Sequence, residues 1–335
     1  MTKRRERSAN PQPTGTAAGL GPAGRGQLWA ALLLAAILGL GWLALHRGGG
    51  LGRRAADRIG GVTACQHQPR FAATLGLGSG AAFGTAVEGV MGLAIVSAGP
   101  DGAPSIYQHP SWDDAGYLGP FTTDAEGNVF TAPVPLVSLV ENPLGQQNRL
   151  LRIDTDSQVM TELVTLPPAR EPSSANPFGV VGLAFDCETG SLYASSLAGS
   201  TASEELGRIF QVEAASGRLR SQLDGVDAMG LGVFRGSGGK RLYFGRTRSP
   251  ELHSVALDAT GAFVGAPRLE LSLADQVRGG LATPRRLRFG AGPQLRLHMM
   301  DFNYSLQVAA RREEREIDLR YDPASDRWQL IAADG

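Results

Sequence analysis

Apolar and polar positions alternate in short runs along most of this chain, and each run ends at residues that favour turns. The stretch LAFDCETGSLYASS, residues 183–196, shows the pattern clearly. Leu183 and Phe185 alternate with smaller neighbours, Asp186 to Gly190 carry turn chemistry, and the alternation resumes at Leu192. The stretch therefore predicts a β-strand, a tight turn and a second β-strand.

Similar hairpins recur in two families. One family comprises residues 120–132, 183–196, 230–245 and 285–298, and the other comprises 92–109, 149–164, 207–223, 251–271 and 316–331. Aligned on one apolar position (Val96, Ile153, Val212, Leu257 and Tyr321), copies of the second family follow at intervals of 57, 59, 45 and 64 residues. The two families together predict a four-stranded unit that recurs every ~55 residues.

A four-stranded antiparallel sheet cannot bury both of its faces alone, whereas sheets stacked around an axis bury each other. We therefore predict an all-β fold, a β-propeller over residues 70–335. We count five blades of four strands, or six if one is degenerate. Residues 70–88 must supply the inner strand pair of the first blade.

The N-terminal region differs from the rest. Residues 1–27 predict a disordered basic tail, and residues 28–45 form a run of 18 residues without a charge. At ~1.5 Å per residue this run spans a bilayer core as a transmembrane helix. His46 and Arg47 follow it instead of a cleavage site, which favours an uncleaved anchor.

We expect residues 46–69 to link this anchor to the propeller. The protein is then a single-pass protein of an inner or plasma membrane, with a cytoplasmic N-terminus and an extracytoplasmic propeller. With 32 basic and 32 acidic side chains the formal net charge is zero, so we expect no nucleic-acid partner.

The two cysteines, Cys65 and Cys187, form one disulfide if the domain is in an oxidising compartment. Our strand assignment places Cys187 in a turn between the first two strands of a blade. It places Cys65 nearer the opposite face, so the bridge requires a fully extended chain.

The pattern Phe-Asp-x-x-Thr-Gly-x-Leu-Tyr at residues 185–193 resembles propellers of the NHL, strictosidine-synthase-like and gluconolactonase-like superfamily. Gluconolactonase-like enzymes hold a divalent metal at the mouth of the propeller axis. The resemblance implies calcium as the metal and Glu88, Asn176, Asp227 and Asp301 as its ligands. The family's Asn-Gly is replaced by Val181-Gly182, which removes an oxygen ligand that calcium needs.

Long connections predict the recognition surface, because long loops on a rigid scaffold commonly carry binding residues. Residues 133–148, 197–206 and 300–314 are longer than hairpin turns require, and we expect them on one face. This face predicts a non-enzymatic binding or scaffold module for an envelope protein, a peptide or a glycan. The alternative is a calcium-dependent lactonase-like hydrolase. The candidate ligand-binding residues are Glu141, Asn142, Asn176, Asp227, Arg246, Asp301, Asn303 and Tyr304.

Overall fold

The computed structural model describes residues 59–77, 80–99, 103–135, 139–277, 282–290, 292–306 and 314–331. The predicted tail (1–27), the predicted membrane helix (28–45) and residues 46–58 of the predicted linker lie outside these ranges. Among the residues that are described, no helix has both the length and the apolar character needed to cross a bilayer.

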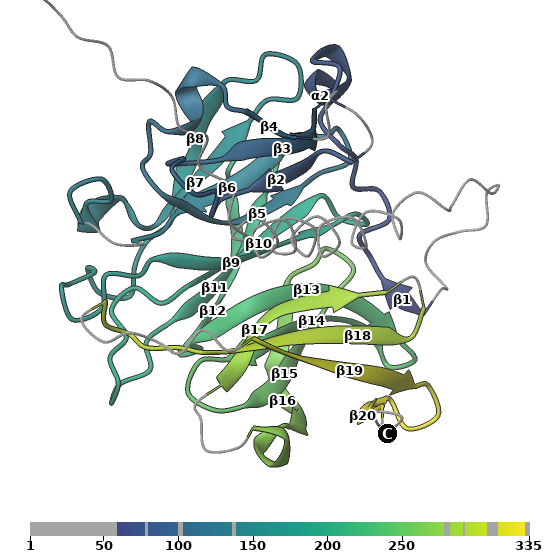
Figure 1. The fold of residues 1–335 in the computed structure, drawn as a ribbon. Coiled ribbons are helices and arrows are strands. Elements are labelled where there is room, and N and C mark those ends of the chain that lie inside the picture. Colours follow the sequence, from purple (N-terminus) through teal and green to yellow (C-terminus); the bar gives the residue numbers. More distant parts are fainter. Residues whose placement is uncertain are drawn as a thin grey trace, which may run out of the picture. The chain divides into compact units, whose positions relative to one another are not determined.

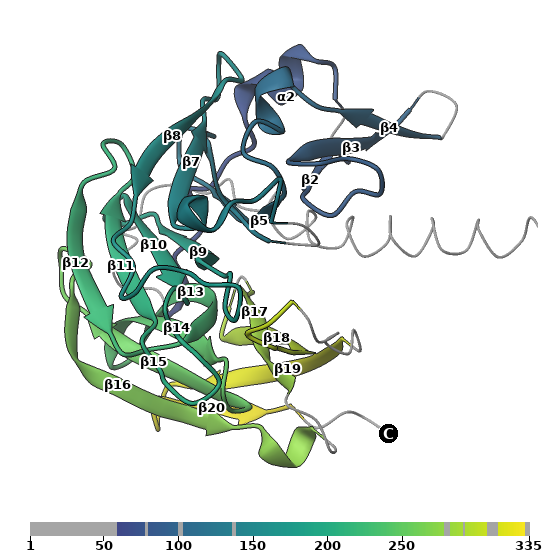
Figure 2. The same cartoon turned by 90° about the vertical axis from the view of Figure 1, so that its left-hand side faces the viewer.

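Five antiparallel sheets follow one another in chain order, and we number them as blades one to five (Figures 1 and 2). The predicted five-bladed, all-β propeller is confirmed. Blade one comprises β2 (Ala82–Gly84), β3 (Ala94–Ala98) and β4 (Pro104–Tyr107). Blade two comprises β5 (Leu118–Thr123), β6 (Val129–Pro133), β7 (Arg149–Ile153) and β8 (Met160–Thr165). Blade three comprises β9 (Val180–Asp186), β10 (Ser191–Ser196), β11 (Arg208–Glu213) and β12 (Leu219–Asp224).

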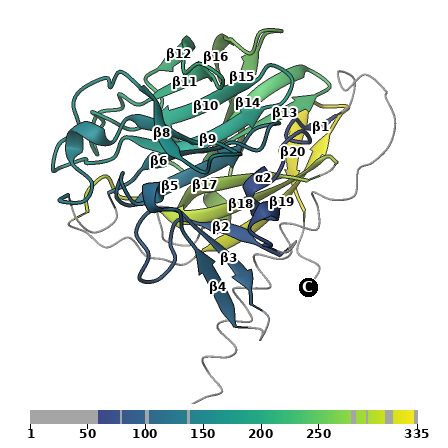
Figure 3. The same cartoon turned by 90° about the horizontal axis from the view of Figure 1, so that it is seen from above.

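Blade four has four long strands and an added short strand on its inner edge, β1, which pairs with β13. Seen from above, the outer strands β12 and β16 of neighbouring blades lie side by side (Figure 3). The strands of blade four are β1 (Gly60–Gly61), β13 (Ala228–Gly236), β14 (Gly239–Arg246), β15 (Glu251–Leu257) and β16 (Phe263–Ser272). Blade five comprises β17 (Ala282–Phe289), β18 (Gln294–Asp301), β19 (Arg315–Asp322) and β20 (Arg327–Leu330).

Aspartates at strand ends close the hairpins that the sequence pattern predicts. The carboxylate of Asp186 accepts hydrogen bonds from the backbone N–H of Glu188 and from the hydroxyl of Thr189. Gly190 follows at φ +64°, a left-handed conformation that glycine adopts without strain. Asp124 and Asp258 cap their turns in the same way. The repeated Asp and Gly are therefore turn-forming residues.

Each pair of consecutive blades shares an apolar core, as the stacking argument requires. Trp112 fills the contact between blades one and two, and Phe130 that between blades two and three. Tyr193 lies between blades three and four, and Phe234 between blades four and five. All four side chains are fully buried, so inter-blade packing is the main apolar contribution to stability.

Blade one differs from the prediction, because three strands are described where we expected four. Residues expected to begin its inner strand pair form the short helix α2 (Arg70–Thr74). Phe71 is on this helix and is 1% exposed, packed against Trp112 with ring centroids 5.7 Å apart. An isolated apolar cluster of this length does not distinguish a strand from a helix turn, and here contact with Trp112 determines the outcome.

The residues before α2 form a strap across one face of the propeller. We call this the turn face, since it carries the turns between the first and second strands of each blade. Gly60 and Gly61 pair with the end of β13, the backbone N–H of Cys187 donates to Val62 O, and that of His67 donates to Asp124 O. The strap (residues 59–69) thus connects blades four, three and two.

A disulfide joins Cys65 in the strap to Cys187 in the blade-three turn, with Cα atoms 5.7 Å apart. Our sequence-based placement of Cys65 nearer the opposite face was wrong. The strap brings Cys65 onto the turn face beside Cys187, so the chain does not have to be fully extended for the bridge to form. The expected linker therefore includes, at residues 59–69, a segment fixed to the domain.

We predict that this bridge is a major source of stability. It closes a loop with a sequence separation of 122 residues, for which chain entropy gives up to about 5 kcal/mol. Replacing both Cys65 and Cys187 by Ala is expected to lower the free energy of unfolding in urea by about 2–5 kcal/mol. Reductant is expected to destabilise the wild-type protein similarly and leave the double variant unchanged. Equal stability of oxidised and reduced wild type would contradict the prediction.

Candidate functional site

The face opposite the strap carries the longer connections, and we call it the long-loop face. Antiparallel order puts the β10–β11, β14–β15 and β18–β19 loops there, together with the connections between blades. Of the eight predicted binding residues, Asp227, Arg246 and Tyr304 are brought together where blades three, four and five meet. Asn176 joins the same neighbourhood through Ser200.

Asp227 is the centre of this cluster and is fully buried. Its Oδ1 accepts hydrogen bonds from Ser200 Oγ at 2.5 Å and from the Gly207 backbone N–H at 2.8 Å. Its Oδ2 accepts from Arg248 Nε at 3.1 Å and from the Tyr304 hydroxyl at 2.5 Å. One carboxylate therefore ties together loops of three consecutive blades, and both of its oxygens are occupied by protein donors.

Tyr304 reaches Asp227 from blade five. Its hydroxyl also lies 2.7 Å from Thr247 Oγ1, and its ring lies 5.2 Å below the guanidinium of Arg248. Burial, followed by the hydrogen bond to Asp227, raises the pKa of Tyr304 above its ordinary value. Tyr304 therefore remains a protonated donor at neutral pH and does not act as a base.

Arg248 and Glu205 hold the β10–β11 loop in place. The guanidinium of Arg248 donates to the carbonyl oxygens of Thr201, Ala202 and Glu204. Glu205 accepts from the Asp227 backbone N–H at 2.8 Å and pairs with Arg246 at 2.5 Å. Neither residue was predicted from the sequence, although Arg248 lies two positions after the predicted Arg246 and Glu205 lies inside the long loop 197–206.

Two predicted residues, Asn142 and Asn176, are buried and hold the backbone in place. Asn142 is 1% exposed and binds the backbone of Ala115 and Tyr117, which fixes the connection between blades one and two. Glu141 is exposed beside it. Asn176 is 2% exposed and binds Leu197 O, Ser200 O and the Phe178 backbone N–H, so its amide is fully used inside blade three.

The four residues implied as calcium ligands do not form a metal site. In the described ranges no group of three or more His, Cys, Asp or Glu side chains could hold a metal ion. Glu88 is exposed between β2 and β3, and Asp301 ends β18 opposite Ala282. The donors that surround Asp227 already occupy both of its oxygens. A calcium-dependent hydrolase therefore has no support in this geometry.

Aromatic side chains border the Asp227 cluster. Phe302 lies 5.0 Å from Tyr304 and 5.4 Å from Phe178, measured between ring centroids. Phe302, Asn303 and Phe178 are all partly exposed, and Asn303 Oδ1 accepts from the Ser305 backbone N–H. Two partly exposed aromatic rings, Phe302 and Phe178, thus lie on loops that hydrogen bonds hold in place, an arrangement suited to recognition.

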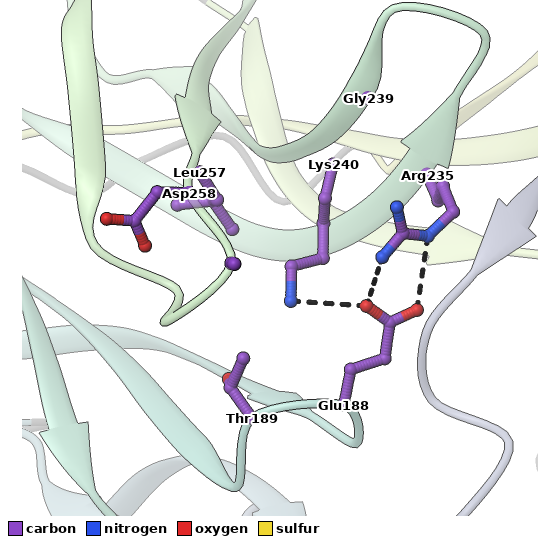
Figure 4. A pocket seen from close by; sticks show the side chains of 8 residues that line it. Glu188, Thr189, Arg235, Gly239, Lys240, Leu257 and Asp258 are labelled. Carbon is purple, nitrogen blue, oxygen red and sulfur yellow. Dashed lines mark hydrogen bonds and ion pairs between the residues drawn. The ribbon is translucent and has the colours of Figure 1, made fainter. Parts of the chain in front are cut away.

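A separate pocket of about 490 Å³ opens on the turn face (Figure 4). Its buried Lys240 lies 2.6 Å from Asp186 and 3.3 Å from Glu188, and Arg235 pairs with the same Glu188. Burial opposes the charged form of Glu188, but the hydrogen bond from Arg235 and the charge of Lys240 hold its pKa below its usual value. Both cations of the pocket are thus paired with carboxylates, and we assign it no ligand.

No protein-family model matches this chain, and no curated protein sequence matches it significantly. Solved structures give distant similarities. A protein from Lactobacillus plantarum is 12% identical, with 76% of this chain and 67% of that chain covered and a TM-score of 0.44. The nidogen/laminin complex gives 13% identity, coverage of 72% of each chain and a TM-score of 0.41. PQQ-bound aldose sugar dehydrogenase from Streptomyces coelicolor is 15% identical, with 68% of this chain and 71% of that chain covered and a TM-score of 0.38.

Similarities of this size bring no activity or ligand to this chain. The resemblance to NHL-like and gluconolactonase-like propellers is confirmed at the level of architecture, because the five sheets succeed one another as propeller blades.

We predict that the Tyr304 hydroxyl stabilises the loops. Tyr304→Phe removes a donor to a buried carboxylate, and we expect the free energy of unfolding in urea to fall by about 1.5–3 kcal/mol. Tyr117→Phe is the matched control, since its ring is partly exposed, and we expect a change within about 0.5 kcal/mol. Similar values for the two variants would show that the Asp227 contact contributes nothing.

Proposed function

We propose that this protein is a membrane-anchored, extracytoplasmic binding propeller whose long-loop face recognises a peptide or glycan. The observation that carries the proposal is the occupancy of Asp227: four donors from three blades use both oxygens, so the carboxylate orders the loops instead of reacting. Loops ordered in advance lose less conformational entropy when they bind, which favours recognition.

The partly exposed side chains beside Asp227 suit a polar ligand with an apolar part. Phe302 and Phe178 offer ring faces, while Arg246, paired with Glu205, and Asn303 offer polar groups. Aromatic and arginine side chains are those that most often dominate binding energy at interfaces.

Two features support an extracytoplasmic location. The disulfide between Cys65 and Cys187 is a bond that persists in oxidising compartments. The run of 18 uncharged residues at 28–45 precedes the propeller in the chain, as expected of a domain exported behind a membrane anchor.

We expect Phe302→Ala to abolish recognition without loss of fold. Screening the full chain in detergent against peptide and glycan arrays is expected to give a ligand whose affinity falls about tenfold or more in this variant. Val264→Ala, at a 50% exposed position on β16, is the control and should bind normally. A ligand that binds both variants with equal affinity would place the recognition surface elsewhere.

The anchor is tested separately by fractionation. The full chain is expected to remain in the membrane pellet after alkaline carbonate washing, because 18 uncharged residues bury in the bilayer. Removing residues 28–45 is expected to release the protein. Protease added outside intact cells or spheroplasts should digest the propeller, and protection from it would overturn the proposed orientation.

A further inference from the structure

The two faces of blade five have opposite character. One face packs Leu295, Leu297 and Leu319 into the core shared with blade four. The side chains that alternate with these point the other way, and we call their surface the outward face of blade five. Strand register places six of them in two rows, Arg286, His298 and Glu316 in one and Arg288, Arg296 and Asp318 in the next.

A third row continues the surface with Gln294, Arg320 and Gln329. All nine of these positions are polar, whereas the described interfaces between consecutive blades are apolar. Ile331, bonded to Asp318 through the backbone and 38% exposed, adds one apolar residue at the edge of the second row. These rows hold four arginines and two carboxylates, and Glu314, two residues before Glu316, adds a third carboxylate that acts on Arg288 and His298, so the excess is one positive charge when His298 is neutral. All four arginines are exposed.

The charges on this face are unevenly paired. Arg296 binds both carboxylates, at 2.7 Å to Asp318 and 3.3 Å to Glu316. In the described part of the chain, the guanidinium groups of Arg286 and Arg288 make no hydrogen bond and no ion pair, although the backbones of both residues pair with β18. Two residues apart on β17, their Cβ atoms lie about 7 Å apart on the same side of the sheet. The two guanidinium groups thus lack a direct carboxylate partner, while Glu316 and Glu314 act on Arg288 without contacting it.

His298 lies beside this pair, opposite Arg286 in the register. It is only 5% exposed, yet neither ring nitrogen has a hydrogen-bond partner, although Nδ1 is 3.4 Å from Glu316 Oε1. Burial, followed by the charge of Arg288, lowers the pKa of His298, so the ring is neutral and one nitrogen is an N–H donor. A buried polar group without a partner is uncommon in folded proteins, and here it leaves an N–H donor free to bond an external acceptor.

Other parts of the same protein do not complement this face. In the part of the chain that the structure describes, no strand of blade one packs closely against a strand of blade five. Residues 1–58 contain nine Lys and Arg but only two acidic residues, Glu6 and Asp57, so their sequence offers little charge complementary to arginines. A second copy packed face to face would bring arginine rows against arginine rows. An external anion is the complementary occupant.

We propose that the outward face of blade five binds an acidic polysaccharide, with Arg286 and Arg288 on its carboxylates. Arginine holds carboxylates through two parallel hydrogen bonds. The carboxylate and amide side chains of the same rows accept and donate hydrogen bonds to sugar hydroxyls. A protein partner would favour an apolar centre, whereas the apolar residue next to these rows, Ile331, lies at their edge.

The test uses the full chain in detergent with polygalacturonate, a polymer of acidic sugars, in buffer of low ionic strength. We expect saturable binding that weakens with salt, and an affinity about tenfold or more lower for Arg286→Gln/Arg288→Gln. The matched control, Arg218→Gln/Arg220→Gln, removes two exposed arginines, one just before β12 and one within it, and should bind like the wild type. Arg286→Lys/Arg288→Lys keeps the positive charges but removes the planar guanidinium groups that can form two parallel hydrogen bonds. We expect this variant to give an intermediate affinity.

Several outcomes would overturn the proposal. Absence of polygalacturonate binding, or equal loss in both glutamine variants, would exclude a specific site on blade five. Binding to phosphatidylglycerol vesicles or to DNA without binding to polygalacturonate would assign the arginine pair to phosphate groups. Neutral dextran bound as tightly as polygalacturonate would exclude charge as the basis.

Discussion

The structure depends on one constraint: an antiparallel blade has two faces, and each must be covered by a neighbour or be made polar. Blades two, three and four meet the constraint by packing both faces against adjacent blades, with Trp112, Phe130, Tyr193 and Phe234 in the four shared cores. The turns, the disulfide and the loops all attach to this stack. Each repeat of the hairpin pattern in the sequence therefore corresponds to one blade of the stack.

The ends of the series follow the same constraint in a different way. Blade five covers one face with blade four and makes the other polar, with His298 and four arginines. The strap does not complete blade five as an outer strand. It adds β1 to blade four and is tied to blade three by the disulfide. Contacts on the turn face thus connect the blades without a strand pairing shared by the first and last sheets.

On the long-loop face, Asp227 shows why a buried carboxylate is not by itself a catalyst. A buried charge is costly unless paired and hydrogen-bonded, and here Arg248, Tyr304, Ser200 and Gly207 satisfy it completely. The carboxylate stabilises the arrangement of three loops, and the residues around it remain for recognition. The proposed binding function rests on this arrangement.

The sequence by itself determined the hairpins, their repetition and the propeller, because alternation, Asp-Gly turns and apolar strands are local properties. It also placed Asp227, Arg246 and Tyr304 on one face, since antiparallel order alone assigns loops to faces. Only the tertiary structure decided that Phe71 lies on a helix, that Cys65 meets Cys187 on the turn face, and that Asn142 is buried. These depend on contacts between residues far apart in the chain, which no local pattern contains.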